Sequence, residues 1–221
     1  MLTFDKFKAE YEEYAFDCAC ALRIAEARLI NIQEALVHYG KTRSQFRIES
    51  RIKTLESAWK KYQRKISKYG DTDDIQKYLH DVAGIRIITV FRDEIKTVAQ
   101  LLESVSGISV TDKKDYVAEP KSNGYSSYHL DTMVEIFPMR TKIVPVEIQI
   151  RDKAMNLWAS HEHILKYKND NPDSRTQELF KKMADALNVY SNLVIEYRDQ
   201  AHAPEEANTE ADQGGSSSVL T

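Results

Sequence analysis

Apolar residues near the start of the chain recur at intervals of three and four. This spacing predicts one long amphipathic helix over residues 4–38, which Tyr39 and Gly40 end. A second helix is predicted over residues 52–66. The polar stretch YGDTDD then closes that helix and starts a shorter one that runs to Tyr78.

The middle of the chain changes to runs typical of strands. The segment VAGIRIITVF, residues 82–91, is rich in Val and Ile and predicts a central strand. Asp93 is expected to cap a helix that ends near residue 104. Further strands are predicted over residues 108–116, 128–137 and 143–150, and the short PMRTK connection predicts that the last two form a hairpin. Helices follow over residues 153–168 and 174–198.

This order of elements predicts an α/β (α+β) fold, in which helices flank a mixed β-sheet. The chain of 221 residues is long enough for one compact domain. We divide it into an N-terminal helix (1–40), a core (41–170), a C-terminal helix (171–200) and a tail (201–221). The tail is polar and rich in Gly and Ser, which predicts disorder.

Composition excludes several classes of protein. No apolar run approaches the roughly eighteen residues that a membrane helix needs, and the charged N-terminus has no signal-peptide core. A cytoplasmic protein that does not enter membranes is therefore expected. Cys18 and Cys20 lie two residues apart on one predicted helix, where they face different directions and form neither a disulfide nor a zinc set. Both are expected to be small buried or half-buried side chains.

Basic residues are concentrated in one segment, although the net charge is −3. Between Gly40 and Gly70 ten lysines and arginines are opposed only by Glu49 and Glu56. An ordinary solvated helix face is the alternative. The acidic remainder of the chain favours an anion-binding surface, most simply for phosphate.

Two carboxylates are placed at predicted strands. Asp81 precedes the strand at 82–91, and Glu147 alternates with apolar residues in the strand at 143–150. One interpretation is an edge strand with Glu147 on its solvated face. The other is a site for Mg²⁺ and polyphosphate near Arg86 and Arg151, because Mg²⁺ is usually held by one or two carboxylates plus substrate phosphates. Neither GxxxxGK[ST] nor GxGxxG is present.

Five segments in order resemble a known family. RIK, DVAGIRI, DYVAEPKSNGYSSYHL, VEIQIR and AMNLWASHEHILKYK, within residues 49–168, closely resemble the synthetase domain of RelA/SpoT-type enzymes, in particular the small alarmone synthetases. The resemblance implies a nucleotidyltransferase-like fold that needs Mg²⁺. It also implies transfer of the β,γ-pyrophosphoryl group of ATP to the 3'-hydroxyl of GTP or GDP, giving (p)ppGpp and AMP.

The resemblance also implies roles for individual residues. Asp81 and Glu147 would hold the metal, and Glu147 would be the base for the attacking hydroxyl. ATP would be bound through its adenine by Arg51 and Arg86, and through its phosphates by Lys53, Lys61 and Arg64. A guanidinium stacks on a base face in a way that lysine does not.

The acceptor would be bound by residues of the third, fourth and fifth segments. Tyr125 would stack on the guanine, Lys121 and His129 would contact its phosphates, and Gln149 and Asn156 would lie nearby. The family commonly has arginine after the Gly-Tyr pair, whereas this chain has Ser126. A cation near the acceptor is therefore missing, which leaves the identity of the acceptor open.

Two alternatives follow. Toxic relatives of the small alarmone synthetases transfer pyrophosphate to the 3' end of tRNA and are held by an antitoxin, and a basic segment is compatible with an RNA acceptor. A catalytically silent nucleotide or RNA binder is the other, but it has no need of two desolvated acids. The apolar stripes of the terminal helices predict an oligomer, and the resemblance implies a homotetramer.

The remaining ring side chains near these segments are interpreted as structural. His161 and His163 are not at the i, i+4 spacing of a zinc site, so both are expected either to support the residues of the site or to be structural. Trp59 and Trp158 are expected in the core or at an interface.

Overall fold

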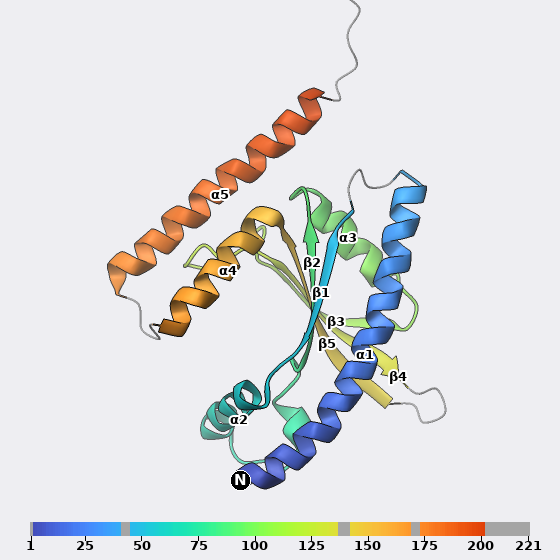
Figure 1. The fold of residues 1–221 in the computed structure, drawn as a ribbon, viewed down its shortest axis with the longest axis vertical. Helices are drawn as coiled ribbons and strands as arrows, with labels where there is room; N and C mark the ends of the chain where they lie inside the picture. Colours follow the sequence, from blue (N-terminus) through green and yellow to red (C-terminus); the bar gives the residue numbers. More distant parts are fainter. Residues whose placement is uncertain (1, 41–44, 137–141, 169–172, 202–221) are drawn as a thin grey trace, which may run out of the picture.

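A five-stranded sheet forms the centre of the molecule (Figure 1). The computed structural model describes residues 2–40, 45–136, 142–168 and 173–201, so the tail beyond Ala201, most of the PMRTK connection, Lys41 and Arg43 lie outside the described residues. The strands stand in the order β1-β2-β5-β4-β3. Their bounds are β1 (Arg47–Ile52), β2 (Ala83–Thr89), β3 (Ile108–Asp115), β4 (Tyr128–Ile136) and β5 (Lys142–Asp152).

The sheet is mixed, as predicted. β2 and β5 run parallel, whereas the β1–β2, β5–β4 and β4–β3 pairs are antiparallel. The predicted pairing of the last two strands is confirmed, and β2 lies inside the sheet as expected for a central strand. The helices come from both ends of the chain and from the β2–β3 crossover, so the sheet is covered by segments far apart in sequence.

Helices lie on both sides of this sheet (Figure 1). α1 (Phe4–His38) and α3 (Glu94–Glu103) lie on one side, and α4 (Lys153–Lys168) and α5 (Ser174–Ala201) lie on the other. α2 (Leu55–Tyr69) and the short 3₁₀-helix η1 (Ile75–Lys77) stand at one end, near the start of α1. None of the helices in the described ranges combines the length and the apolarity of a membrane span.

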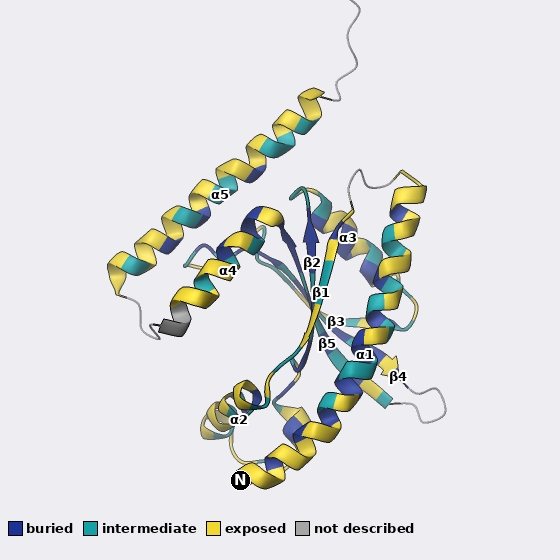
Figure 2. Cartoon of the chain, in the orientation of Figure 1, coloured by how far each residue is buried: buried dark blue, intermediate teal, exposed yellow. Residues whose placement is uncertain are grey.

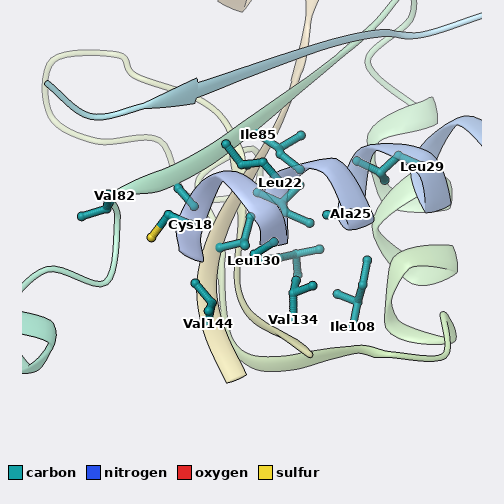
Figure 3. Close-up of a cluster of buried hydrophobic side chains, with 14 of the residues drawn as sticks. Cys18, Leu22, Ala25, Leu29, Val82, Ile85, Ile108, Leu130, Val134 and Val144 are labelled. Atoms are coloured by element: carbon teal, nitrogen blue, oxygen red, sulfur yellow. The ribbon is translucent and has the colours of Figure 1, made fainter. Parts of the chain in front are cut away.

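The main core lies between α1 and the sheet, where every second strand residue faces the helix (Figure 3). Ile85, Ile148 and Leu130 from three adjacent strands are at most 2% exposed, and Leu22 and Leu29 of α1 pack in the same cluster. Burying each such side chain contributes about 1.5–3 kcal/mol. The apolar period of α1 is therefore explained by its position on the sheet.

The cysteine prediction is confirmed. Cys18 is buried in the main core, Cys20 is half-buried, and both are free thiols. Burial raises the pKa of the Cys18 thiol to about 12, so it is protonated at neutral pH. Both residues are therefore part of the packing of α1.

A smaller core joins α4 to α5. Trp158, Phe180 and Ala184 form its buried centre, and the Trp158 indole donates a hydrogen bond to the Phe180 carbonyl at 3.0 Å. Trp59 packs at the other end of the molecule against Phe7 and Tyr62. Both tryptophans are structural, as predicted.

The first strand of the sheet was missed by the sequence prediction. The helix expected over 52–66 begins at Leu55, and Ile52 is the last residue of β1. Phe46 and Ile48 alternate with charged residues, but so many charges in one segment conceal the period-two spacing of a strand. The partner strand β2 also comes much later in the chain, so no local hairpin indicates the pairing. Thr54 then caps α2 by accepting a hydrogen bond from the Ser57 amide at 3.3 Å.

The predicted cap at Asp93 is only partly right. Asp93 occupies the N-cap position of α3, but its side chain makes no capping hydrogen bond. Its carboxylate instead accepts two hydrogen bonds from the Arg198 guanidinium, at 2.7 and 3.0 Å. A bidentate guanidinium is a stronger partner than one backbone amide, so this carboxylate ties α5 to the start of α3.

Candidate active site

The face of the sheet that points away from α1 is polar. Strand pairing places Arg51 opposite Gly84, and Gly84 opposite Glu147. Directly paired residues project to the same face, so three strands bring these positions side by side. The edge-strand interpretation of Glu147 is wrong, because β5 lies between β2 and β4.

A cleft runs along this face. Its first part is lined by Glu49, Ser50, Arg51, Gly84, Ile85, Arg86, Glu147 and Gln149. Arg51, Arg86 and Gln149 also line its second part, which extends to Tyr125 and Arg151. Five residues of α4 complete the lining: Ala159, Ser160, Glu162, His163 and Ile164. The second part has a volume of about 680 Å³, inside the range of roughly 300–1,000 Å³ typical of small-molecule sites. The cleft therefore has room for a nucleotide-sized ligand.

Asp81 lies at one end of this face, just before β2. Its Oδ2 pairs with Lys53 Nζ at 3.1 Å and with Lys61 Nζ at 2.8 Å. Burial alone raises the pKa of the Asp81 carboxyl, but the two ammonium groups outweigh burial and hold the pKa below its usual value. Asp81 is thus an anion at neutral pH.

Two tyrosines of α1 fix the backbone on either side of this cluster. The Tyr11 hydroxyl donates to the carbonyl of Lys53. The Tyr14 hydroxyl donates to the carbonyl of Leu79 at 3.0 Å, two residues before Asp81. The N-terminal helix therefore holds both the carboxylate and one of its lysines in place.

The second oxygen of Asp81 has chemistry that suits a metal ion. Asp81 Oδ1 is buried and has no hydrogen-bond partner among the described residues. The negative charge of Asp81 raises the pKa of Glu147. No cluster of three or more metal-ligating side chains occurs in the described ranges. Mg²⁺ needs only one or two carboxylates beside substrate phosphates, so the residues fit such an ion.

Glu147 is held by hydrogen bonds to both of its oxygens. Oε1 lies 3.3 Å from His129 Nδ1, and Oε2 accepts from Gln149 Nε2 at 2.8 Å. Burial raises the pKa of Glu147, but the hydrogen bond and charge of His129 and the hydrogen bond from Gln149 together keep the pKa below its usual value. The carboxylate is ionised and oriented.

These contacts belong to a closed network, here called the polar ring, of Tyr125, His129, Glu147, Gln149 and Arg151. Arg151 Nη2 donates to the Tyr125 hydroxyl at 2.7 Å and to Gln149 Oε1 at 2.5 Å. The Tyr125 hydroxyl and His129 Nε2 lie 2.7 Å apart. The polar ring therefore links the end of the cleft near Tyr125 to the Glu147 carboxylate.

The loop before β4 brings Tyr125 to this network. Gly124 has a φ of +86°, and a Cβ added to it would lie 2.3 Å from the Ala184 Cβ of α5. Asn123 accepts a hydrogen bond from the Tyr125 amide and donates to Glu162 of α4. Glycine is required at 124 both by its backbone conformation and by α5. The Gly-Tyr pair therefore places a flat ring in the cleft.

The structure distributes the other predicted site residues unevenly. Lys121 is exposed, with its Nζ 4.9 Å from the Tyr125 ring centroid. Arg64 is exposed on α2, three residues after Lys61, and does not line the cleft. Asn156 is half-buried on α4, also off the cleft lining, and its Oδ1 is buried without a partner among the described residues. Ser126 is 3% exposed. His161 and His163 are both exposed, and of the two only His163 lines the cleft.

Glu49 was missed as a site residue, and Arg151 was named near the metal site without the contact to Tyr125 that it makes. Glu49 lines the cleft and pairs with Arg86 at 3.3 Å. Arg151 is buried and supplies the cation of the polar ring. The period-two spacing of Glu147, Gln149 and Arg151 was the available signal for Arg151.

Comparison with known proteins gives a consistent result. The family described as "Region found in RelA / SpoT proteins" matches residues 50–172. GTP pyrophosphokinase YjbM of Bacillus subtilis (strain 168) is 34% identical over 165 residues, which is 72% of this chain and 75% of that protein. GTP pyrophosphokinase YwaC of the same organism is 40% identical over 134 residues, 59% of this chain and 63% of YwaC.

Solved structures show the same fold. Small alarmone synthetase 1 from Bacillus subtilis bound to its product pppGpp has a TM-score of 0.78 and 29% identity, covering 88% of this chain and 99% of that chain. The same protein bound to AMPCPP has a TM-score of 0.70 and 28% identity, covering 87% of this chain and 98% of that one. The mixed sheet flanked by helices is therefore the fold of the small alarmone synthetases.

Proposed function

The chain belongs to the RelA/SpoT family, and we propose that it transfers the β,γ-pyrophosphoryl group of ATP to the 3'-hydroxyl of GTP or GDP. The products are (p)ppGpp and AMP. Relatives named GTP pyrophosphokinases and a similar structure bound to pppGpp support this activity. The observation that carries it is the shared polar face, where an ionised Glu147 lies in one cleft with Arg51, Arg86 and Tyr125.

In this proposal the donor is bound at the β1–β2 side of the cleft. Arg51 and Arg86 lie on adjacent strands of the polar face, where two guanidinium planes are able to hold an adenine between them. Lys53, Lys61 and Arg64 supply positive charge for the ATP phosphates. The lysines are already gathered at Asp81, which fits a site that binds polyphosphate.

The metal in the proposal is Mg²⁺. Asp81 and Glu147 would hold it, since Asp81 Oδ1 is buried without a partner among the described residues and both groups are anions. When bound, the ion would offset negative charge that develops on the transferred group.

The acceptor is bound at the Tyr125 side of the cleft. Tyr125 stacks on the guanine, while Lys121, His129, Gln149 and Asn156 surround the rest of the nucleotide. Glu147 takes the proton of the 3'-hydroxyl, and the hydroxyl oxygen attacks the β-phosphorus of ATP. The bond from that phosphorus to the α,β-bridging oxygen breaks, and AMP leaves with the electron pair. Positioning and charge suffice for such a step without a covalent intermediate.

The tRNA-modifying alternative has less support. Both reported relatives are named GTP pyrophosphokinases, and the cleft has the volume of a nucleotide site. We therefore place a free guanine nucleotide first as the acceptor, in the cytoplasm where these nucleotides are abundant. An antitoxin partner is not part of the proposal.

An oligomer is part of the proposal, with the homotetramer as the preferred state. Exposed apolar side chains on α5 support it, because a helix in water rarely presents so many. They are Leu179, Val189, Tyr190, Leu193 and Tyr197.

One assay tests the function directly. The protein is incubated with Mg²⁺ and γ-labelled ATP, with GDP, GTP and bulk tRNA as competing acceptors, and the labelled species are separated. We expect label on GDP or GTP and release of AMP. Label on tRNA alone would overturn the choice of acceptor, and label on none of the three would contradict the activity.

A further inference from the structure

The contacts of the polar ring form an unbroken chain from Arg151 to Glu147. A guanidinium only donates, so the Tyr125 oxygen accepts from Arg151. His129 Nδ1 lies 3.3 Å from Glu147 Oε1, and because a carboxylate accepts, the imidazole is the donor across this contact. The other ring nitrogen, Nε2, lies 2.7 Å from the Tyr125 hydroxyl, so both nitrogens of the imidazole face groups of the polar ring.

A second branch of the polar ring also leads from Arg151 to Glu147. Gln149 accepts from Arg151 through Oε1 and donates to Glu147 through Nε2. Arg151 is thus the donor at one end of both branches, and Glu147 is the acceptor at the other. Each Glu147 oxygen accepts one hydrogen bond and keeps a further lone pair. The carboxylate is oriented without losing its capacity to take a proton.

We propose that the Tyr125 hydroxyl and His129 are positioning groups, which align the Glu147 carboxylate with the acceptor held on the Tyr125 ring. This inference rests on the proposed function and gives a role to the Tyr125 hydroxyl. Stacking on the guanine does not need that hydroxyl, since a phenylalanine ring would stack as well. It also changes the role of His129. Both of its nitrogens are engaged by protein groups, so its first task is to hold Glu147.

The surroundings of Tyr125 explain how the coupling works. Arg151 lies 5.1 Å and Lys121 lies 4.9 Å from the Tyr125 ring centroid, and the Trp158 ring centroid lies 6.1 Å away. The plane of the Tyr125 ring is therefore fixed by contacts from several directions. An acceptor on that ring and the base at Glu147 share one rigid frame, and misplacement of the base by a fraction of an ångström slows transfer.

Two variants break the same link from opposite sides. Tyr125→Phe removes the hydroxyl and keeps the ring. His129→Asn keeps a donor near the Nδ1 position for Glu147 and loses the nitrogen that faces Tyr125. We expect each to lower kcat about tenfold, with the acceptor KM within about twofold of the wild-type value.

The double variant distinguishes coupling from two separate defects. If the hydroxyl acts through His129, Tyr125→Phe/His129→Asn has the kcat of the single variants. Tyr128→Phe is the matched control. Tyr128 lies on β4 beside His129, but its side chain packs against the main core on the α1 side of the sheet. Its kcat is expected to equal that of the wild type.

The result that overturns the inference is equally specific. The positioning role would be contradicted if the fold-losses in kcat of the two single variants multiplied in the double variant. It would also be contradicted if Tyr125→Phe changed only the acceptor KM. Circular dichroism and thermal melting confirm that each variant is folded. A wild-type protein that labels no acceptor would instead contradict the proposed function, so the two failures are distinguishable.

Discussion

The two oxygens of Asp81 have different surroundings, and that difference leads to a prediction. One oxygen binds two lysines, and the other is buried without a partner among the described residues. Asp81→Asn keeps the shape but removes the charge that would hold a divalent ion, so we expect kcat to fall at least about a hundredfold. The fall in kcat is measured as the rate of Mg²⁺-dependent transfer from labelled ATP.

A matched variant keeps that test specific. Asp185 also pairs with a lysine, Lys181 at 3.2 Å, but it is exposed on α5. Asp185→Asn is expected to leave transfer unchanged. If Asp81→Asn, with an unchanged circular dichroism spectrum, keeps the wild-type rate, the metal assignment of Asp81 is wrong.

Individual residues were predictable where a local pattern carries them. Glu147 and Gln149 stand out because they alternate with apolar residues in one strand. Arg151 follows the same alternation, but its partner Tyr125 arrives from a loop before β4, and no local pattern shows that contact. Glu49 was missed for a related reason, since its value to the site depends on pairing with Arg86 across two strands.

At the scale of elements, α5 controls the loop that carries Tyr125. Ala184 packs so closely on Gly124 that neither position has room for a larger residue. We expect Ala184→Leu to displace the loop and raise the acceptor KM about tenfold, while the KM for ATP stays near its wild-type value, because the Arg51 side of the cleft does not touch α5. Initial rates at varied GDP and varied ATP measure both constants.

The same substitution two residues later is the control for this prediction. Ala186 is exposed on α5, so Ala186→Leu adds the same atoms without meeting the loop. It is expected to leave both KM values unchanged. An Ala184→Leu protein with a wild-type acceptor KM would show that α5 does not position the loop.

Elements differ in how well the sequence predicts them, for a physical reason. α1 and β2 have an unbroken apolar period because one face of α1 and most of β2 are buried, and both were predicted nearly to their ends. β1 is an edge strand whose outward residues form part of the cleft, so charge replaced the expected apolar content. The charged residues that β1 contributes to the cleft are therefore the reason that it was not predicted as a strand.

For the whole molecule, one buried carboxylate joins the sheet to the helices on its polar side. Asp152, at the end of β5, accepts hydrogen bonds from Ser191 Oγ at 2.6 Å, from the Met155 amide at 2.7 Å and from Arg92 Nε at 3.2 Å. These donors come from α5, α4 and the segment before α3. A carboxylate that is 1% exposed needs such partners, and they fix α5 over the acceptor side of the cleft.

One face of α5 points away from the molecule, which predicts assembly (Figure 2). Of its 28 residues only Phe180, Ala184 and Ser191 are buried, although Val189 and Leu193 are apolar. We expect light scattering to give a mass above that of the 25.5 kDa chain, and Val189→Glu/Leu193→Glu to give a smaller species, because burying an unpaired charge opposes association.

The control for this assembly test lies on the same helix. Asn192→Glu adds a charge beside Leu193, at a position that is polar and exposed, and is expected to leave the mass unchanged. A wild-type protein that is monomeric at every concentration would contradict assembly through α5. The packing of α5 on the rest of its own chain is confined to a narrow stripe. If only the dissociated variant loses transfer, α5 needs a second copy of the chain to hold Ala184 against Gly124.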